Sequence, residues 1–528
     1  MSGNNIIWII VDSVRNYRCD AENVDDRGRI ELMDELAKTW VDFKTVVTSA
    51  PSTMMSLGAM FTSCPAYYLG SNFVDLRLYD FNRHNIGSIL RKNGYATCCI
   101  TLGPYEREAF DGVLDILPRS FWPKGARHRY EWNNYQCNIA LENLIKAGMK
   151  EPFFLLVHYN CRGDDFISEN VDNGLNILAK DNILDRSIVF LTSDHGYPDP
   201  VRKQQIEKIR QQAGLIETEV AHDLVLTEDN ILVPLLLKYP GVEPRTIEEQ
   251  ICTLDYLPTS LSLAGIPYPA DDFFGMDVTP LIHGKKIPAI EQRSVRVDGR
   301  FLAQTGRITA IRRHDYKYVI NHDDHVPDQE QLHDLKNDPL ETRNFASDYP
   351  DLLEQFRKLF TEDEERCRAF HIEFFKDKYN NQLKRLTDDP KSIKRLGYIE
   401  AGIKNFDDIM ETIFEKCHLD SVVIYKNRSE VEEMEDESLD LLIVGLSSKI
   451  GNRHLFKRVH KIKSNIKLIA DLNMNLFKFT PLYPLAILRG HWIKRKYYLQ
   501  EPLYLYSDLK ATLRHRVGLP VKKHIFKQ

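Results

Sequence analysis

The sequence has no long hydrophobic run. The first apolar run, Ile6–Val11, stops after six residues, and the run Pro481–Ile487 is also short, whereas a helix that crosses a membrane needs about 20 apolar residues. Residues 1–5 contain no lysine or arginine, so the positively charged start of a secretion signal is missing as well. We therefore expect a cytoplasmic protein without a transmembrane segment.

Cysteine and net charge also say little about function. The nine cysteines are odd in number and none has zinc-site spacing, which argues against a structural zinc site and against a complete disulfide framework. A net charge of -6 on 528 residues indicates no class of partner. The composition, 43% hydrophobic and 28% charged, is typical of a globular protein, and the length suggests at least two domains.

Two apolar runs end in side chains that bind metal ions. Ile6–Val11 is followed by Asp12, and Ser187–Thr192 is followed, after one serine, by Asp194 and His195. Continuous apolar runs of this length indicate buried strands of a parallel sheet. Open α/β sheets place their sites at the carboxyl ends of such strands. The sequence therefore predicts that these three side chains lie at one edge of a sheet.

The stretch Thr48–Ser63 combines small and hydroxyl residues with a helix-like apolar run. A hydroxyl at the start of a helix is close to backbone N–H groups and to the positive end of the helix dipole, which attract anions. The simpler interpretation is an ordinary N-cap. Together with Asp12, Asp194 and His195, however, Thr53 completes a set of oxygen and nitrogen ligands for one divalent cation.

An ordered set of segments resembles the sulfatase branch of the alkaline phosphatase superfamily. The resemblance covers about residues 4–402 and rests on IIWIIVDSVR, APSTMMSLGAMFTS, FLTSDHG, DNILVPLLLKYPG, TLDYLPTSLSLAGIPYP, AIRRHDYKYV, LHDLKNDPLETRNFA and RLGYIEAG. It implies an α/β fold with a mixed sheet sandwiched by helices, and a small C-terminal sheet near residues 290–345. We expect this catalytic domain to span 1–402.

The remaining residues, 403–528, have a different pattern. Ser421–Tyr425, Leu439–Gly445 and Ile466–Asp471 are strand-like and are separated by helical signals, which predicts a second, small α/β domain of Rossmann-like type. The tail from Arg489 is basic, with interleaved tyrosines. It is either a solvated face or a binding surface for an anionic partner such as nucleic acid, anionic lipid or an anionic glycan carrier.

The resemblance allows two registers for the nucleophile. Thr53 precedes Thr62 by nine residues, the spacing that the family shows between its nucleophile and the threonine of a Thr-Gly pair, and Ser56 matches the serine that follows the nucleophile. The competing register takes Ser49–Ser52 as the family's Cys-x-Pro-Ser signature and makes Ser49 the nucleophile. We prefer Thr53.

This preference decides the predicted chemistry. By the resemblance, sulfatases convert a cysteine or serine into formylglycine, and threonine would give a ketone instead of that aldehyde. Ser13 also stands where sulfatases have a second aspartate. We therefore predict a metal-dependent phosphodiesterase or phosphotransferase in which Asp12, Thr53, Asp194 and His195 hold Mn²⁺ or Zn²⁺, with Ca²⁺ less suitable.

Further residues are candidates for contact with the substrate. Arg15 is expected to clamp non-bridging oxygens, and His158 and His222 are the acid or base candidates, each with a packing or surface role as the alternative. Arg162 stands near the place of a second family histidine and is interpreted as a substrate clamp. Tyr105 is a candidate pocket residue, although a packing role is the more common one.

Two other functions stay open at this point. One is a sulfuric ester hydrolase that works without formylglycine or through Ser49, and the other is a catalytically silent, sulfatase-like binding scaffold. The expected substrate is a small-molecule or glycan- or lipid-linked anionic ester. We also expect copies of the chain to form a homo-oligomer.

Overall fold

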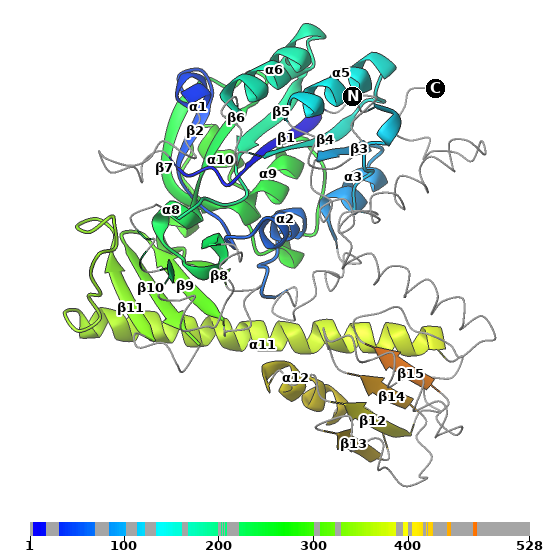
Figure 1. Cartoon of the computed structure of the whole chain (residues 1–528), viewed down its shortest axis with the longest axis vertical. Coiled ribbons are helices and arrows are strands. Elements are labelled where there is room, and N and C mark those ends of the chain that lie inside the picture. The colour runs from blue at the N-terminus through cyan, green and yellow to red at the C-terminus, as the bar shows by residue number, and fades with distance from the viewer. Residues whose placement is uncertain are drawn as a thin grey trace. The chain divides into compact units, whose positions relative to one another are not determined.

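The structure is a computed structural model of the chain (Figure 1). It describes residues 4–16, 31–68, 84–101, 113–121, 134–160, 167–198, 202, 204, 206–207, 221–299, 307–322, 329–386, 394–399, 404–415, 419, 421–425, 441–444 and 468–471. The described residues divide into two compact units. The first unit comprises the described residues up to Tyr67 and those of 84–357, and the second comprises Tyr68 and the described residues from Lys358 on.

The first unit is built on a seven-stranded sheet of order β3-β4-β1-β5-β6-β2-β7. All neighbouring pairs are parallel except those of β6, which is antiparallel to β5 and to β2. The strands are β1 (Asn5–Asp12), β2 (Val41–Val47), β3 (Ala96–Thr101), β4 (Phe153–Asn160), β5 (Ser187–Thr192), β6 (Leu232–Lys238) and β7 (Arg245–Cys252).

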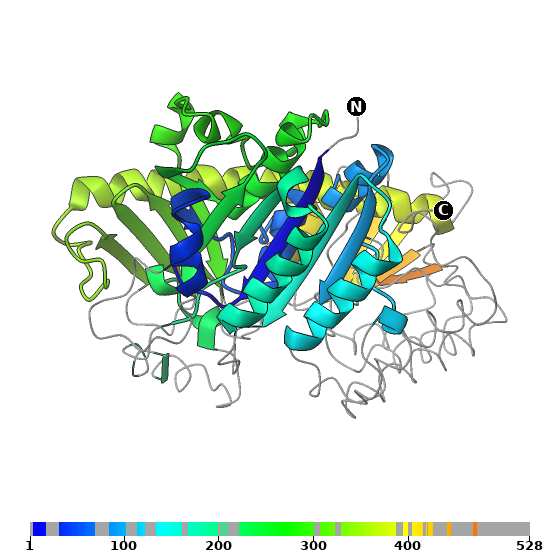
Figure 2. The ribbon, with the colours of Figure 1, turned by 90° about the horizontal axis from the view of Figure 1, so that it is seen from above.

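Helices cover both faces of this sheet. The helices of the unit are α1 (Glu31–Leu36), α2 (Thr53–Thr62), α3 (Ile86–Lys92), α5 (Asn134–Ala147), α6 (Ile167–Lys180), α8 (Glu228–Ile231), α9 (Tyr256–Leu263) and α10 (Thr279–Ile282). Figure 2 shows the cyan helices α5 and α6 along one face. The mixed sheet between helices confirms the fold class that the sequence predicts.

The central strand β1 supplies side chains to both layers. Ile7, Ile9 and Val11 belong to the core that includes residues of α5 and α6. Trp8 points the other way and its ring packs on Phe61 of α2 and Tyr256 of α9, with centroids 6.2 and 6.1 Å apart. Because alternate strand residues face opposite sides, a continuous apolar run is what a strand between two helical layers requires.

A smaller antiparallel sheet completes the first unit. Its order is β11-β10-β9-β8, and it confirms the second sheet predicted near residues 290–345. The strands are β8 (Val295–Gly299), β9 (Ile308–Arg313), β10 (Tyr316–Asn321) and β11 (Glu330–Asp334). The helix α11 (Pro350–Leu386) follows.

The second unit contains a four-stranded sheet of order β13-β12-β14-β15, parallel throughout. Its elements are β12 (Arg395–Ile399), α12 (Lys404–Glu415), β13 (Ser421–Tyr425), β14 (Leu441–Val444) and β15 (Leu468–Asp471). Strand β12 contains Leu396–Tyr398, which the sequence analysis placed at the end of the first domain. Its hydrogen bonds go to β13 and β14, so this stretch lies inside the parallel sheet of the second unit.

Among the described residues, no helix is both long enough and apolar enough to span a membrane.

Candidate active site

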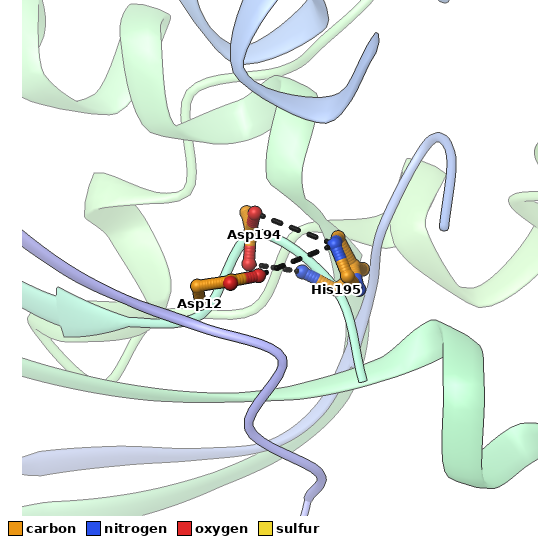
Figure 3. Close-up of side chains that lie close together, drawn as sticks. All are labelled: Asp12, Asp194 and His195. Carbon is orange, nitrogen blue, oxygen red and sulfur yellow. Dashed lines mark hydrogen bonds and ion pairs between the residues drawn. The ribbon is translucent and has the colours of Figure 1, made fainter. Parts of the chain in front are cut away.

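Three predicted metal ligands meet at the carboxyl edge of the large sheet. Asp12 is the last residue of β1, and Asp194 and His195 follow β5. Strands β1 and β5 are parallel neighbours, so their carboxyl ends lie together. One carboxylate oxygen of each aspartate and one ring nitrogen of His195 all lie within 4.8 Å of one another. Figure 3 shows the three side chains pointing toward one another.

The tautomer of His195 suits a metal ligand. Its Nδ1 lies 2.7 Å from the carbonyl oxygen of Gly196, which only a protonated Nδ1 satisfies, so Nε2 is the ring nitrogen that is available to a metal ion. Nε2 lies 3.5 Å from Oδ1 of Asp12 and 3.5 Å from Oδ2 of Asp194. Nε2 is therefore the ring nitrogen that faces two carboxylate oxygens.

The electrostatics of the site favour a bound cation. Burial and the neighbouring charge of Asp194 raise the pKa of Asp12, because two carboxylates in a low-dielectric site repel each other. Oδ2 of Asp194 is buried and accepts no hydrogen bond within the described structure. Buried acceptors of this kind are rare, and a divalent cation would satisfy both carboxylates and Nε2 together. The residues present thus fit one metal ion.

Thr53 places its hydroxyl at this cluster. It is the first residue of α2, and Ser52 before it has the extended backbone of an N-cap. Oγ1 of Thr53 lies 3.3 Å from Nε2 of His195. The hydroxyl therefore stands at the amino end of a ten-residue helix and beside the atom that would hold the metal, as the preferred register requires.

Ser49 has different neighbours. Its backbone N–H donates to Oγ1 of Thr253 at 3.3 Å, and its carbonyl accepts from the N–H of Asp298 at 3.2 Å. Its hydroxyl is buried and makes no hydrogen bond to a described residue. Of the two candidate nucleophiles, Thr53 is the one whose hydroxyl contacts a predicted metal ligand, His195.

Ser13 binds both carboxylates from the position where sulfatases have a second aspartate. Its hydroxyl donates to Oδ1 of Asp12 at 2.8 Å, and its backbone N–H donates to Oδ1 of Asp194 at 3.2 Å. Its backbone has a positive φ of 64°, which is uncommon for a residue with a side chain. Ser13 thus orients the two ligands and adds no third negative charge.

Hydroxyl groups that the sequence analysis did not assign to the site hold the Asp194–His195 turn. Thr48 and Ser56 each donate to the carbonyl of Asp194 at 2.7 Å, and Ser193 donates to the carbonyl of His195 at 2.7 Å. Ser56 lies three residues after Thr53, on the same face of the helix, and this spacing is the signal that indicates a role beside the nucleophile.

The two other histidines lie at the edges of the cluster. Nε2 of His158, near the end of β4, is 4.0 Å from Oδ2 of Asp194. His222 lies in a short 3₁₀ helix, Ala221–Leu224, and its ring centroid is 4.3 Å from that of His195. Nδ1 of His222 is 2.5 Å from the carbonyl of Pro51. Both positions agree with a role at the site, and the roles themselves stay predictions.

The remaining candidates are only partly described. Arg15 is buried three residues after Asp12. Tyr105, Arg162 and the basic tail from Arg489 lie outside the described residues, so their predicted roles stay predictions.

Comparison with known proteins agrees with this fold. Residues 4–161 match the family model described as Sulfatase, and residues 222–366 match that of N-sulphoglucosamine sulphohydrolase, C-terminal. Choline-sulfatase of Rhizobium meliloti is 28% identical over 185 residues, 34% of this chain and 31% of that protein. Delta 4,5-hexuronate-2-O-sulfatase of Bacteroides thetaiotaomicron is 25% identical over 296 residues, 53% of this chain and 54% of that protein.

A solved structure shows the same fold. The structure of a 2-O GAG sulfatase aligns with a TM-score of 0.54 and 17% identity, over 69% of this chain and 92% of that chain. The fold and the edge-of-sheet site place the protein in the alkaline phosphatase superfamily. Within that superfamily, the chain is a member of the sulfatase-like branch. It spans about half the length of the curated relatives it matches, or less.

The predicted action on phosphate esters is wrong. The relatives and solved structures that carry an activity in their names are sulfatases, among them a choline-sulfatase, a hexuronate sulfatase, an arylsulfatase and an N-acetylglucosamine-6-O-sulfatase. The error has a physical reason. Sulfate and phosphate esters are both tetrahedral oxyanions, and a hydroxyl beside a metal can attack either, so the identity of Thr53 does not choose between them.

Proposed function

We propose that this site hydrolyses sulfuric esters through the hydroxyl of Thr53. The observation that carries the proposal is the 3.3 Å contact between Oγ1 of Thr53 and Nε2 of His195, in a chain of the sulfatase-like branch. Carbohydrate sulfates are the substrate class that we favour, because the curated match of 296 residues is to a hexuronate sulfatase. A cytoplasmic location is part of the proposal, and fractionation of cells tests it.

Asp12, Asp194, His195 and Thr53 would hold the metal, which we propose to be Mn²⁺ or Zn²⁺. Sulfatase-type sites are richer in carboxylates by the resemblance noted above, whereas this set has two carboxylates, an imidazole and a hydroxyl. An imidazole ligand favours a transition metal over Ca²⁺, which prefers six to eight oxygen ligands. When bound, the metal polarises the ester oxygens and lowers the pKa of the coordinated hydroxyl.

The nucleophilic attack and the proton transfers are assigned to side chains of the protein. Oγ1 of Thr53 attacks the sulfur, an O–S bond forms, and the bond from sulfur to the alcohol oxygen breaks. The leaving alcohol takes a proton from His222 or His158. Water then attacks the sulfur of the sulfothreonine ester and gives one proton back to that histidine and the other to Oγ1 of Thr53, so that sulfate leaves and the threonine hydroxyl is restored. The proton that Thr53 lost in the first step goes to the solvent.

The geometry of His222 suits the proton donor. Because Nδ1–H donates to the carbonyl of Pro51, Nε2 is the atom that remains for proton transfer. The carbonyl belongs to the chain just before Thr53, so the same hydrogen bond ties the ring to the nucleophile segment. Arg15 and the amino end of α2 supply positive charge for the sulfate oxygens.

The experiment that tests this function is a panel of esters given to the purified protein with Mn²⁺, Zn²⁺ or Ca²⁺. We expect turnover of an aryl sulfate and of sulfated uronate or glucosamine sugars, with Mn²⁺ or Zn²⁺ more effective than Ca²⁺. Mass spectrometry of a peptide that covers residues 48–63 should show that Thr53 carries no modification. Turnover of phosphodiesters with none of sulfates would contradict the proposal, and a protein that turns over neither ester class would be the silent scaffold.

Removing the metal should lower both activity and stability. A cation that binds only the folded protein adds about 2.7 kcal/mol of stability at 100 times its Kd, so the melting temperature should fall on dialysis against a chelator and return with Mn²⁺. The control is Asp194→Asn, whose melting temperature should not respond to Mn²⁺. Equal melting curves of the wild-type protein with and without Mn²⁺ would argue against a metal at this site.

A further inference from the structure

One short segment accepts backbone hydrogen bonds from the three chain segments that carry Asp12, Thr53 and the Asp194–His195 pair. The segment is Asp229–Leu232, at the end of α8 and the start of β6. Its four consecutive carbonyl oxygens accept from the backbone N–H groups of Tyr197 at 3.2 Å, Gly196 at 2.9 Å, Thr48 at 2.9 Å and Asn16 at 3.1 Å, in that order. These donors lie beside His195, at the start of the nucleophile segment and after Asp12. We call Asp229–Leu232 the brace.

The contact between the brace and the His195 loop is close. A Cβ at Gly196 would lie 2.3 Å from the carbonyl oxygen of Asp229 and 3.1 Å from Cα of Asn230, so only glycine allows this approach. This contact fixes the backbone of Gly196, the residue that directly follows His195.

Asn230 adds a side-chain contact to the second histidine of the site. It is fully buried, and its amide Nδ2 donates to the carbonyl of His222 at 2.6 Å and to that of Val225 at 2.5 Å. The ring of His222 in turn lies 4.3 Å from that of His195. Asn230 therefore holds the backbone of His222 through its side-chain amide, and through its own carbonyl it holds the backbone of Gly196, the residue after His195.

The brace is itself anchored by buried charges. Glu228 pairs with Arg312 at 2.9 Å and with Lys317 at 3.1 Å, and Asp229 pairs with Arg202 at 3.0 Å. Arg312 and Lys317 belong to β9 and β10 of the small sheet. Buried ion pairs to the small sheet and to Arg202 thus fix this part of the chain, which makes the brace a rigid reference for the metal ligands.

We propose that Asn230 is a positioning residue that sets the orientation of His195 and His222 for metal binding and catalysis. An amide NH₂ has two donors, which match the two carbonyls of His222 and Val225. Partners that orient metal ligands without touching the metal change metal affinity by about 10- to 100-fold when removed. This inference rests on the metal site of the proposed function. Asn230 itself is not one of the four proposed metal ligands.

The test compares Asn230→Ala and the milder Asn230→Ser with Asn138→Ala. Asn138 is a matched control, because it is also buried, donates to the carbonyl of Asn170 at 2.8 Å, and accepts from Tyr159 at 2.6 Å, away from the site. The probe is Mn²⁺, titrated into each chelator-treated protein and followed by the electron paramagnetic resonance signal of the free ion. Circular dichroism reports folding.

Because the Asn230 side chain reaches His195 only through the ring of His222, we expect the Kd for Mn²⁺ to rise by up to about 10-fold in Asn230→Ala, less in Asn230→Ser, and not at all in Asn138→Ala. Wild-type affinity in folded Asn230 variants, an equal loss in Asn138→Ala, or a wild-type protein that binds no Mn²⁺ would each overturn the proposal. Sulfate turnover is measured separately. An Asn230-dependent affinity without any sulfate turnover would leave this inference standing and remove the proposed function.

Discussion

Replacing Thr53 by alanine should reduce kcat/KM for an aryl sulfate by at least about a thousandfold, since removal of a nucleophile leaves only the catalysis that comes from binding and charge. The side chain starts α2, and its Oγ1 is the hydroxyl that lies 3.3 Å from Nε2 of His195. Thr53→Ser keeps a hydroxyl at the same place and should retain measurable turnover. Initial rates of the metal-loaded proteins give the result.

Ser49→Ala is the matched control for this experiment. The hydroxyl of Ser49 is buried and bonds to no described residue, and its backbone contacts do not depend on the side chain. Its loss should change kcat/KM by less than about threefold, as expected when no buried partner is left unsatisfied. If Ser49→Ala abolished turnover and Thr53→Ala did not, the nucleophile would be Ser49 and the register chosen here would be wrong.

The sequence predicts that Asp12, Asp194 and His195 meet, as the structure shows, because their signals are local. An apolar run that stops at Asp12, and another that stops before Asp194 and His195, are consequences of parallel strands buried on both faces. Strand order cannot be read from such runs, yet both metal segments follow strands that end at the same sheet edge. Their meeting therefore depends on the fold class, which the motifs indicate, more than on detailed packing.

The supporting residues were not predictable in the same way. Asn230 lies in the short helix α8 just before β6, and the partners of its side chain are the backbone carbonyls of His222 and Val225. Hydrogen bonds to backbone carbonyls place no constraint on the partner's side chain, so no pattern in the sequence pairs them. Thr48 is similar, since its contact is the carbonyl of Asp194.

The parallel sheet of the second unit shows another limit of sequence patterns. Strand β12 was assigned to the first domain because RLGYIEAG resembles a family landmark, whereas hydrogen bonds place it between β13 and β14. An apolar run predicts a strand but not its neighbours. The substrate class is difficult to predict for a similar reason. A hydroxyl nucleophile can be recognised from a short motif, but the choice between sulfate and phosphate depends on the whole set of contacts around the anion.

The largest effect on stability is expected at Lys317, far along the chain from the metal ligands. Its side chain is fully buried, and its ammonium lies 3.1 Å from Oε1 of Glu228 and 2.5 Å from Oε1 of Glu341. Burial alone would raise the pKa of Glu228, but Arg312 and Lys317 lower it to about 2. Burial raises the pKa of Glu341, and Lys317 opposes that rise. One cation thus stabilises two buried carboxylates.

Lys317→Met should lower the free energy of unfolding by about 3–5 kcal/mol at pH 7, because it leaves buried carboxylates without their cation. The midpoint of urea unfolding measures the loss. Lys38→Met is the control: Lys38 forms an exposed pair with Glu35, and such pairs contribute about 0–1 kcal/mol. A loss in Lys317→Met no greater than that of Lys38→Met would mean that the ion network does not stabilise the fold.

The deficit of Lys317→Met should also depend on pH. Without the ammonium, the folded-state pKa of Glu341 rises further above its unfolded value of about 4.5. A carboxyl with a raised folded pKa binds a proton more tightly when folded, so its contribution to stability is present at low pH and is lost as the pH rises through the folded pKa. The variant should therefore lie closer to the wild type at pH 5 than at pH 7. Since Glu228 is bound by the same cation and begins α8, Mn²⁺ affinity measured at both pH values would show whether the brace transmits this loss to the site.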